Sequence, residues 1–118
     1  MSEFEHERMQ VYRTAIEFLV LADATAAALP RGRAYLADQL RRAASSISLN
    51  IAEGAGEFSP PDKARFYRIA RRSATESAAI IDACRVLGLA NDESVATSRE
   101  LLLRVVAMLT ALVKTLSG

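Results

Sequence analysis

Three short breaks divide a chain of 118 residues into four long stretches that contain almost no glycine or proline. The breaks are Pro30-Arg31-Gly32, the passage from Gly54 to Pro61, and the passage from Gly88 to Asn91. Glycine and proline at such points end one helix or begin the next. The pattern therefore predicts four helices, at roughly residues 5–29, 33–54, 60–87 and 92–116.

Capping signals mark the starts of the third and fourth segments. Ser59 precedes Pro60-Pro61-Asp62, an order in which serine caps backbone donors, proline fits the first turn and aspartate faces the positive end of the helix dipole. Asn91 is followed by two acidic residues and predicts the start of the fourth helix in the same way. Gly88 is suited to the left-handed conformation that ends the third.

Within each segment, apolar or small side chains recur at steps of three and four residues, which is typical of one buried helix face. Short links place successive helices side by side and antiparallel. We therefore expect one domain over residues 1–118, an all-α, antiparallel up-down four-helix bundle. The predicted core faces are Val11, Ala15, Phe18, Ala22 and Leu29; Leu36, Leu40, Ala44, Ile47 and Ile51; and Phe66, Ile69, Ser73, Ile80, Cys84 and Leu87.

The first and fourth segments carry more apolar surface than one core face requires. Ile16, Leu19 and Val20 flank the first core face. Four polar side chains in residues 101–116 cluster on about 140° of the helix and leave about 220° apolar, whereas a globular core needs somewhat more than about 100°. The excess predicts contacts between subunits. The alternative is a broad face that is covered within the monomer. The four polar residues are Arg104, Thr110, Lys114 and Thr115.

The basic residues are concentrated in the middle of the chain, although the net charge is only +1. Residues 31–85 hold ten basic and six acidic side chains, whereas residues 1–30 hold two and five. Thirteen of the fifteen basic residues are arginine, which pairs well with carboxylates or phosphates. The bias therefore favours either salt-bridged interfaces or nucleic acid.

One face of the third predicted helix is basic. Arg65, Arg68 and Arg72 are spaced three and four residues apart, with Lys63 and Arg71 beside them. Such a face can follow phosphate groups. The alternative is a solvated or salt-bridged face. We predict phosphate contacts for four arginines of the third helix and two weaker candidates of the second: Arg65, Arg68, Arg71 and Arg72, with Arg41 and Arg42.

A polar cluster is predicted between the second and third helices. Ser46, Asn50 and Glu53 share one side of the second helix beside two core isoleucines, so they are expected to be partly buried and to need partners. Arg72, Ser73 and Glu76 of the third helix are the candidate partners. We interpret the cluster of Ser46, Asn50, Glu53, Ser73 and Glu76 as a hydrogen-bond network that sets helix register. A binding site is the alternative.

The sequence contains no complete catalytic or metal-binding pattern: Glu3 to His6 forms one Glu-x-x-His motif, whereas a di-iron bundle needs two with two further glutamates. The single cysteine, Cys84, falls in an apolar core face, and the single histidine, His6, lies near the N-terminus. No glycine-rich phosphate loop occurs. We expect no enzyme activity, no cofactor and no metal. The acidic N-terminus does not resemble a signal peptide, and residues 101–116 fall short of the ~20 needed to span a bilayer. These features predict a cytoplasmic protein without membrane contact.

The passage from the second to the third helix resembles the bacterial four-helix bundle proteins related to the 23S rRNA intervening-sequence protein, sometimes labelled ribosomal protein S23. The shared pattern is a basic pair, small residues, Asn-Ile-Ala-Glu-Gly, a turn with serine and aspartate, and a helix bearing an aromatic residue. In this chain it reads Arg41-Arg42-Ala43-Ala44, Ser46-Ile47, Asn50-Ile51-Ala52-Glu53-Gly54, Ser59, Asp62, Arg65-Phe66, Ile69-Ala70, Ser73 and Glu76.

This resemblance implies an antiparallel bundle that assembles into a homopentameric ring without known enzymatic activity. The family includes accessory proteins of diversity-generating retroelements, which resemble basic barrels that bind nucleic acid and a reverse transcriptase. Here Glu57 follows Gly56, where many relatives carry a basic residue, and the balanced charge also differs from the basic members. The leading hypothesis is a non-enzymatic oligomeric scaffold that binds RNA or DNA. The alternative is a protein-interaction module whose arginines form subunit salt bridges.

Overall fold

The computed structural model describes residues 2–117, which form four α-helices and two short 3-10 helices and contain no β-strand. The predicted all-α class is confirmed for this part of the chain. None of its helices has an apolar stretch long enough to cross a lipid bilayer. The elements are η1 (Glu5–Arg8), α1 (Gln10–Ala28), η2 (Arg31–Arg33), α2 (Ala34–Gly56), α3 (Pro60–Val86) and α4 (Asp92–Ser117).

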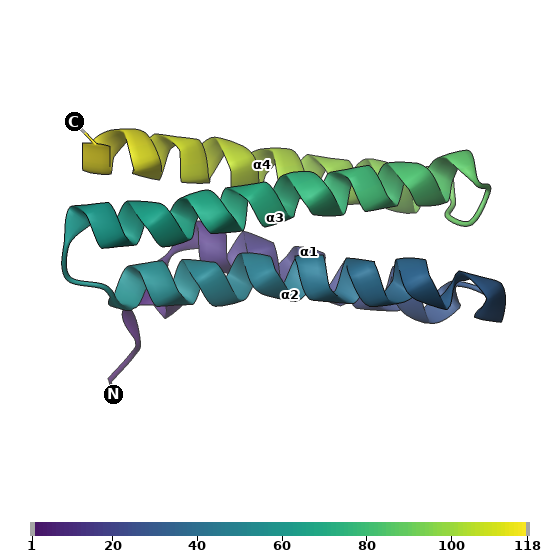
Figure 1. Cartoon of the computed structure of the whole chain (residues 1–118), viewed down its shortest axis with the longest axis horizontal. Helices are drawn as coiled ribbons and strands as arrows, with labels where there is room; N and C mark the ends of the chain where they lie inside the picture. Colours follow the sequence, from purple (N-terminus) through teal and green to yellow (C-terminus); the bar gives the residue numbers. More distant parts are fainter. Residues whose placement is uncertain (1, 118) are drawn as a thin grey trace.

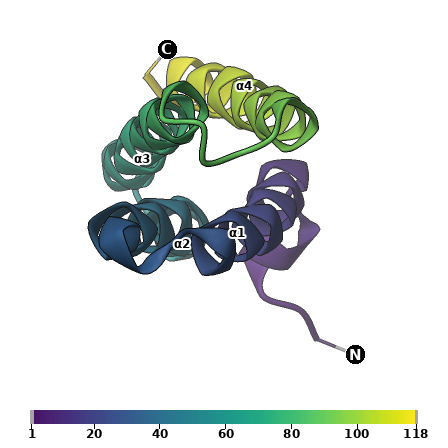
Figure 2. The same ribbon diagram turned by 90° about the vertical axis from the view of Figure 1, so that its right-hand side faces the viewer.

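Each long helix packs against the helix before or after it in the chain, and α1 also packs against α4. The chain reverses direction at each connection, so that the N-terminal segment, the α2–α3 connection and the end of α4 lie at one end of the molecule (Figure 1). The end-on view shows α1 beside α2 and α3 beside α4, in two layers (Figure 2). The molecule measures 44 × 32 × 22 Å along its principal axes.

The predicted capping residues make the predicted contacts. The Ser59 side chain accepts a hydrogen bond from the backbone N–H of Asp62 at 3.2 Å, with Pro60 and Pro61 in the first turn of α3. The Asn91 Oδ1 accepts from the backbone N–H of Ser94 at 2.8 Å, which fixes the start of α4. Gly88 has a φ of 72°, a left-handed conformation that glycine adopts without a steric penalty.

Two predicted helix bounds were wrong. The first segment does not run unbroken from residue 5, because Met9 is extended (φ −85°, ψ 126°) between η1 and α1. The Met9 sulfur lies 3.9 Å from the Tyr67 hydroxyl of α3, a tertiary contact that a local pattern does not contain. The second helix does not stop at Gly54 but continues to Gly56.

The core faces predicted for the first two helices are buried, except that Leu29 is only half-buried. In α3 the prediction was wrong for Phe66 and Ile69, which are half-buried, and for Leu87, which is exposed. The face that α3 buries carries mainly small side chains, and these bring its backbone close to the neighbouring helices. Its buried residues are Ala64, Tyr67, Ala70, Ser73, Ala74, Ser77, Ile80, Ile81 and Cys84.

Part of the apolar excess of α1 and α4 remains uncovered within the chain. Val20 is 68% exposed and Leu103 is 60% exposed. An open apolar groove of about 370 Å³ also lies between the start of α1 and the end of α4, where it is lined by Val11, Met108 and Leu112. The described residues therefore leave these apolar surfaces open.

Gly54 lets α2 and α3 approach closely. A Cβ atom at this position would lie 2.7 Å from Cε1 of the buried Tyr67 ring and 3.2 Å from the Lys63 carbonyl oxygen. The Lys63 ammonium donates to the carbonyl oxygens of Gly54 and Ala55, at 3.3 and 3.0 Å. A cation at the C-terminus of α2 satisfies orphan carbonyls and opposes the negative end of the helix dipole. One turn of α3 therefore both packs against and caps α2.

Replacing Gly54 with alanine is expected to lower the free energy of unfolding by about 1–2 kcal/mol, because overpacking against Tyr67 outweighs the gain in helix propensity. Gly56→Ala is the matched control, since a Cβ at Gly56 would meet nothing within 4 Å. Urea unfolding followed by circular dichroism measures both. Equal stability of the two variants would contradict the close approach.

Candidate nucleic-acid interface

A hydrogen-bond network joins α2 and α3 through three of the five residues predicted for it. The Ser73 hydroxyl donates to the Ser46 hydroxyl at 2.8 Å. The Asn50 amide nitrogen donates to the same Ser46 hydroxyl at 3.0 Å and to the Ser46 carbonyl at 2.8 Å. Ser46 and Asn50 are half-buried and Ser73 is buried, so these bonds satisfy polar groups that water reaches poorly.

Glu53 and Glu76 lie outside this network. Both are exposed and form no hydrogen bond with the three residues. A carboxylate is costly to bury without a paired charge, so the helix positions at the solvent boundary hold the two glutamates while the smaller neutral groups face inward. The spacing of three residues places Glu53 beside Asn50, but it does not determine where the glutamate side chain points.

Three of the predicted arginines form an exposed row on α3, called here the arginine stripe: Arg65, Arg68 and Arg72. All three are exposed. At about 100° per residue they fall within an arc of about 60°, and they extend over about 10 Å of the helix axis. None forms an ion pair with a carboxylate among residues 2–117.

Arg71 stands beside the stripe, at the side that faces α4. It is half-buried, and its Nη1 donates to the Thr110 hydroxyl at 3.3 Å. Together with Arg68 and Arg72 it lines an open groove of about 500 Å³ that also touches Thr75, Glu76 and Val106. Three guanidinium groups therefore border one groove between α3 and α4.

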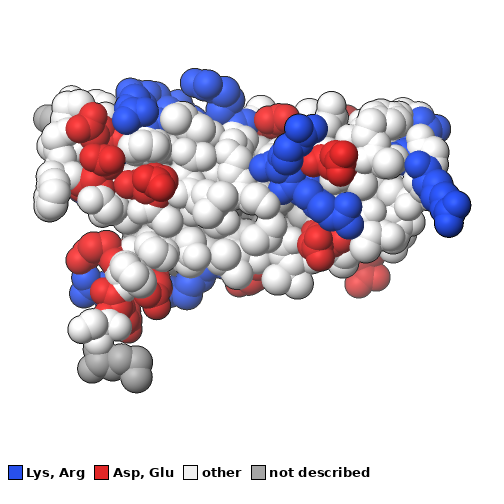
Figure 3. All heavy atoms as spheres, turned by 60° about the horizontal axis from the view of Figure 1, so that its bottom comes forward, with Lys and Arg blue, Asp and Glu red and all other residues white. Residues whose placement is uncertain are grey.

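Arg41 and Arg42 lie on α2, apart from the stripe. The Nε of Arg41 is 3.3 Å from Oδ1 of Asp23 on α1, so this arginine already has an acidic partner. Arg42 is exposed and forms no ion pair within the described range. On the face turned forward in Figure 3, positive and negative side chains lie in small groups, some of them in contact with each other, around a broad uncharged surface.

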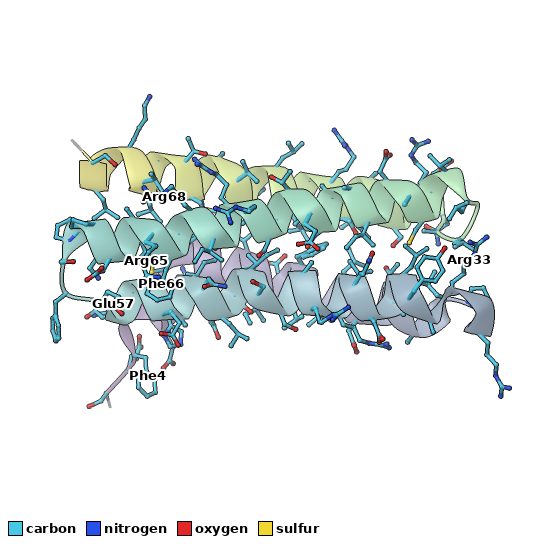
Figure 4. The ribbon with its side chains drawn as sticks, viewed as in Figure 1. Phe4, Arg33, Glu57, Arg65, Phe66 and Arg68 are labelled. Carbon is cyan, nitrogen blue, oxygen red and sulfur yellow. The ribbon has the colours of Figure 1, made fainter. Side chains whose placement is uncertain are left out.

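Phe66, which was predicted for the core, is half-buried at the edge of α3. The guanidinium carbon of Arg65 lies 4.4 Å from the centroid of the Phe66 ring. Arg65 and Phe66 lie together on the side of α3 that faces α2, Arg68 lies farther toward α4, and Arg33 is at the opposite end of the molecule (Figure 4). The adjacency of Arg65 and Phe66 in the sequence is the feature from which this contact could have been predicted.

The remaining reactive side chains do not converge on a site. Burial raises the pKa of the Cys84 thiol, which disfavours the nucleophilic thiolate. Burial likewise raises the pKa of Tyr67. His6 packs against the rings of Phe4 and Tyr12. Among residues 2–117, no group of three or more histidine, cysteine, aspartate or glutamate side chains is arranged to hold a metal ion.

A family model described as 23S rRNA-intervening sequence protein matches residues 7–111. The chain belongs to this family. The match covers α1, α2, α3 and most of α4, so it extends well beyond the passage that carries the resemblance in the sequence, and the prediction of this family is confirmed. Comparison with curated proteins finds no significant match. The arginine stripe and the network of Ser46, Asn50 and Ser73 both lie within the part that the 23S rRNA-intervening sequence protein model covers.

Replacing Ser73 with alanine is expected to lower the free energy of unfolding by about 0.5–1.5 kcal/mol, because it removes the hydroxyl that donates to Ser46 across the α2–α3 contact. Ser45→Ala is the control, since the Ser45 hydroxyl bonds only to a carbonyl of its own helix. Thermal unfolding of the two single variants, Ser46→Ala and the double variant gives the coupling energy. Full additivity of Ser46→Ala and Ser73→Ala would show that the bond contributes nothing.

Proposed function

We propose that this protein is a non-enzymatic, homo-oligomeric scaffold or accessory protein of the cytoplasm that binds RNA or DNA through the arginine stripe. The single observation that carries the proposal is the exposure of Arg65, Arg68 and Arg72 on one helix face without a carboxylate partner among the described residues. Arginines that are already neutralised could not release counterions from a phosphate backbone, whereas these three can.

The geometry of the stripe suits a phosphate chain. Guanidinium groups donate two parallel hydrogen bonds to a phosphate, and they stay charged at any physiological pH. Arg68 and Arg72 also border the groove that Arg71 shares, so a phosphate that enters it meets three guanidinium groups and one carboxylate, that of Glu76. Arg41 and Arg42 are secondary contacts in this proposal, because Asp23 competes for Arg41.

The proposed subunit is the up-down four-helix bundle, and the proposed assembly is a homopentameric ring. Exposed Val20, Leu49 and Leu103 support assembly, since an isolated chain would leave these apolar side chains in water. A ring needs a head-to-tail interface that joins two different faces of each subunit, and apolar surface is present on α1, α2 and α4. The family resemblance supplies the number five.

The assembly is expected to have the mass of five chains in solution, independent of concentration over the micromolar range. Light scattering after size-exclusion chromatography measures this mass. Val20→Glu is expected to reduce it, because a charge at a buried subunit contact is costly. Glu17→Gln, at an exposed position of the same helix, is the control. A single-chain mass for the unmodified protein would contradict the proposed assembly.

Changing Arg65, Arg68 and Arg72 together to glutamine is expected to weaken the binding of a labelled RNA or DNA oligonucleotide by about tenfold or more at low salt. The slope of log affinity against log salt should fall by about three, one unit for each lost phosphate contact. Fluorescence anisotropy over a salt series measures both quantities.

The control for this experiment changes Arg8, Arg31 and Arg104 to glutamine, which removes the same charge from exposed positions on other elements. It should leave most of the affinity intact. Unchanged binding in the stripe variant would refute the assignment of the stripe.

The second candidate function is a protein-interaction module whose arginines form salt bridges between subunits. The observation that favours it is the exposure of Glu53 and Glu76, which form no ion pair among residues 2–117 and could meet arginines of a neighbouring copy. This function predicts that the stripe variant loses its assembled mass and that the unmodified protein does not bind oligonucleotides. The two candidates therefore differ in the outcome of one experiment.

A further inference from the structure

The Arg65 guanidinium and the Phe66 ring, called here the platform, are in contact at the edge of the arginine stripe. The guanidinium lies 4.4 Å from the ring centroid and remains exposed, while Phe66 is half-buried beneath it. A cation over an aromatic face is held by the ring's quadrupole, which restricts the orientation of the arginine. The exposed guanidinium is thus a planar group held close to the ring and not a freely moving charge.

The platform and the phosphate-binding groups occupy neighbouring parts of α3. Phe66 lies about 100° around the helix from Arg65, on the side away from Arg68. The groove with Arg71 lies on the other side of the stripe, toward α4. A chain that crosses the stripe therefore meets a planar surface on one side and a row of guanidinium donors on the other. Figure 4 shows Arg65 and Phe66 on the side of α3 toward α2, with Arg68 farther toward α4.

Only a single strand offers groups that match both parts. In a duplex the base faces are stacked inside, and the protein meets mainly phosphates and groove edges. In a single strand the bases are free to stack on aromatic rings or on guanidinium planes while the backbone follows a basic surface. The balanced net charge of +1 points the same way, because a duplex rewards dense positive charge that this chain lacks.

We infer that the ligand of the arginine stripe is single-stranded RNA or DNA, with a base stacked on the Arg65 guanidinium, Phe66 behind it, and phosphates paired with Arg68 and Arg72. This inference rests on the proposed nucleic-acid binding and specifies its substrate class. If a base stacks on Arg65, the affinity depends on an accessible base face and on the planar guanidinium group. A purely electrostatic contact needs only the positive charge.

The test compares three probes at one salt concentration: a labelled 15-nucleotide single strand, the same strand in a duplex, and inorganic polyphosphate as a competitor without bases. The unmodified protein should bind the single strand at least about tenfold more tightly than the duplex. Phe66→Leu keeps an apolar side chain but removes the ring, and it should weaken single-strand binding about tenfold. The amount of polyphosphate that displaces the single strand from Phe66→Leu should be no larger than the amount that displaces it from the unmodified protein.

Arg65→Lys is the second variant, because it keeps the positive charge and removes the guanidinium plane; it should weaken single-strand binding about fivefold to tenfold. Phe4→Leu is the matched control, since Phe4 is 71% exposed on the N-terminal segment and is not part of the stripe, and it should bind as the unmodified protein does. Circular dichroism checks helicity, and if Phe66→Leu does not fold, Arg65→Lys decides the question.

The outcomes separate this inference from the proposed function. Equal affinity for single strand and duplex, together with normal binding by Arg65→Lys, would overturn the inference. If the stripe triple variant still lost binding, the proposed function would stand. If Phe66→Leu lost both its assembled mass and its binding, the inference would also be overturned, because Arg65 and Phe66 would then form a contact between subunits. No binding of any probe by the unmodified protein would overturn both.

Discussion

Tyr67 packs against the backbone of Gly54, and much of the arrangement around the α2–α3 contact depends on this approach. Without a side chain at Gly54, the two helices come close enough for Lys63 to cap the end of α2 and for Ser73 to reach Ser46. These three contacts fix the rotation and the register of α3 relative to α2. Because helix rotation decides which residues face solvent, the same contacts determine which side of α3 is exposed.

The arginine stripe is a consequence of that rotation. With Tyr67 and the small residues of α3 turned inward, Arg65, Arg68 and Arg72 are turned outward, and Phe66 lies at the boundary beside Arg65. A large aromatic residue at this boundary leaves part of its ring for contact with the arginine. The packing requirement at Gly54 and the chemistry of the proposed nucleic-acid surface are therefore linked through one helix, although they involve different residues.

The sequence was most informative where local rules apply. Ser59, Asn91 and Gly88 predicted their helix ends because caps and left-handed turns involve neighbouring residues only. The core faces of α1 and α2 followed from their apolar periodicity, as did the exposure of part of the α1 and α4 surfaces. The arginines of the stripe were also recognisable from spacing, since residues three and four apart share a helix face whatever the tertiary structure.

Rotation of a helix with two possible buried faces was not determined by its sequence. In α3, Phe66 and Ile69 suggested one face, whereas Ala64, Ala70 and Ala74 form the one that is buried, because close packing against α2 favours small side chains over large ones. The cost of burying a carboxylate separates Ser73, which is buried, from Glu53 and Glu76, which remain in solvent. The sequence alone determined the four helices, their order and the family. Only the tertiary structure decided which side of α3 meets the solvent, since that depends on the distance between two backbones far apart in the chain.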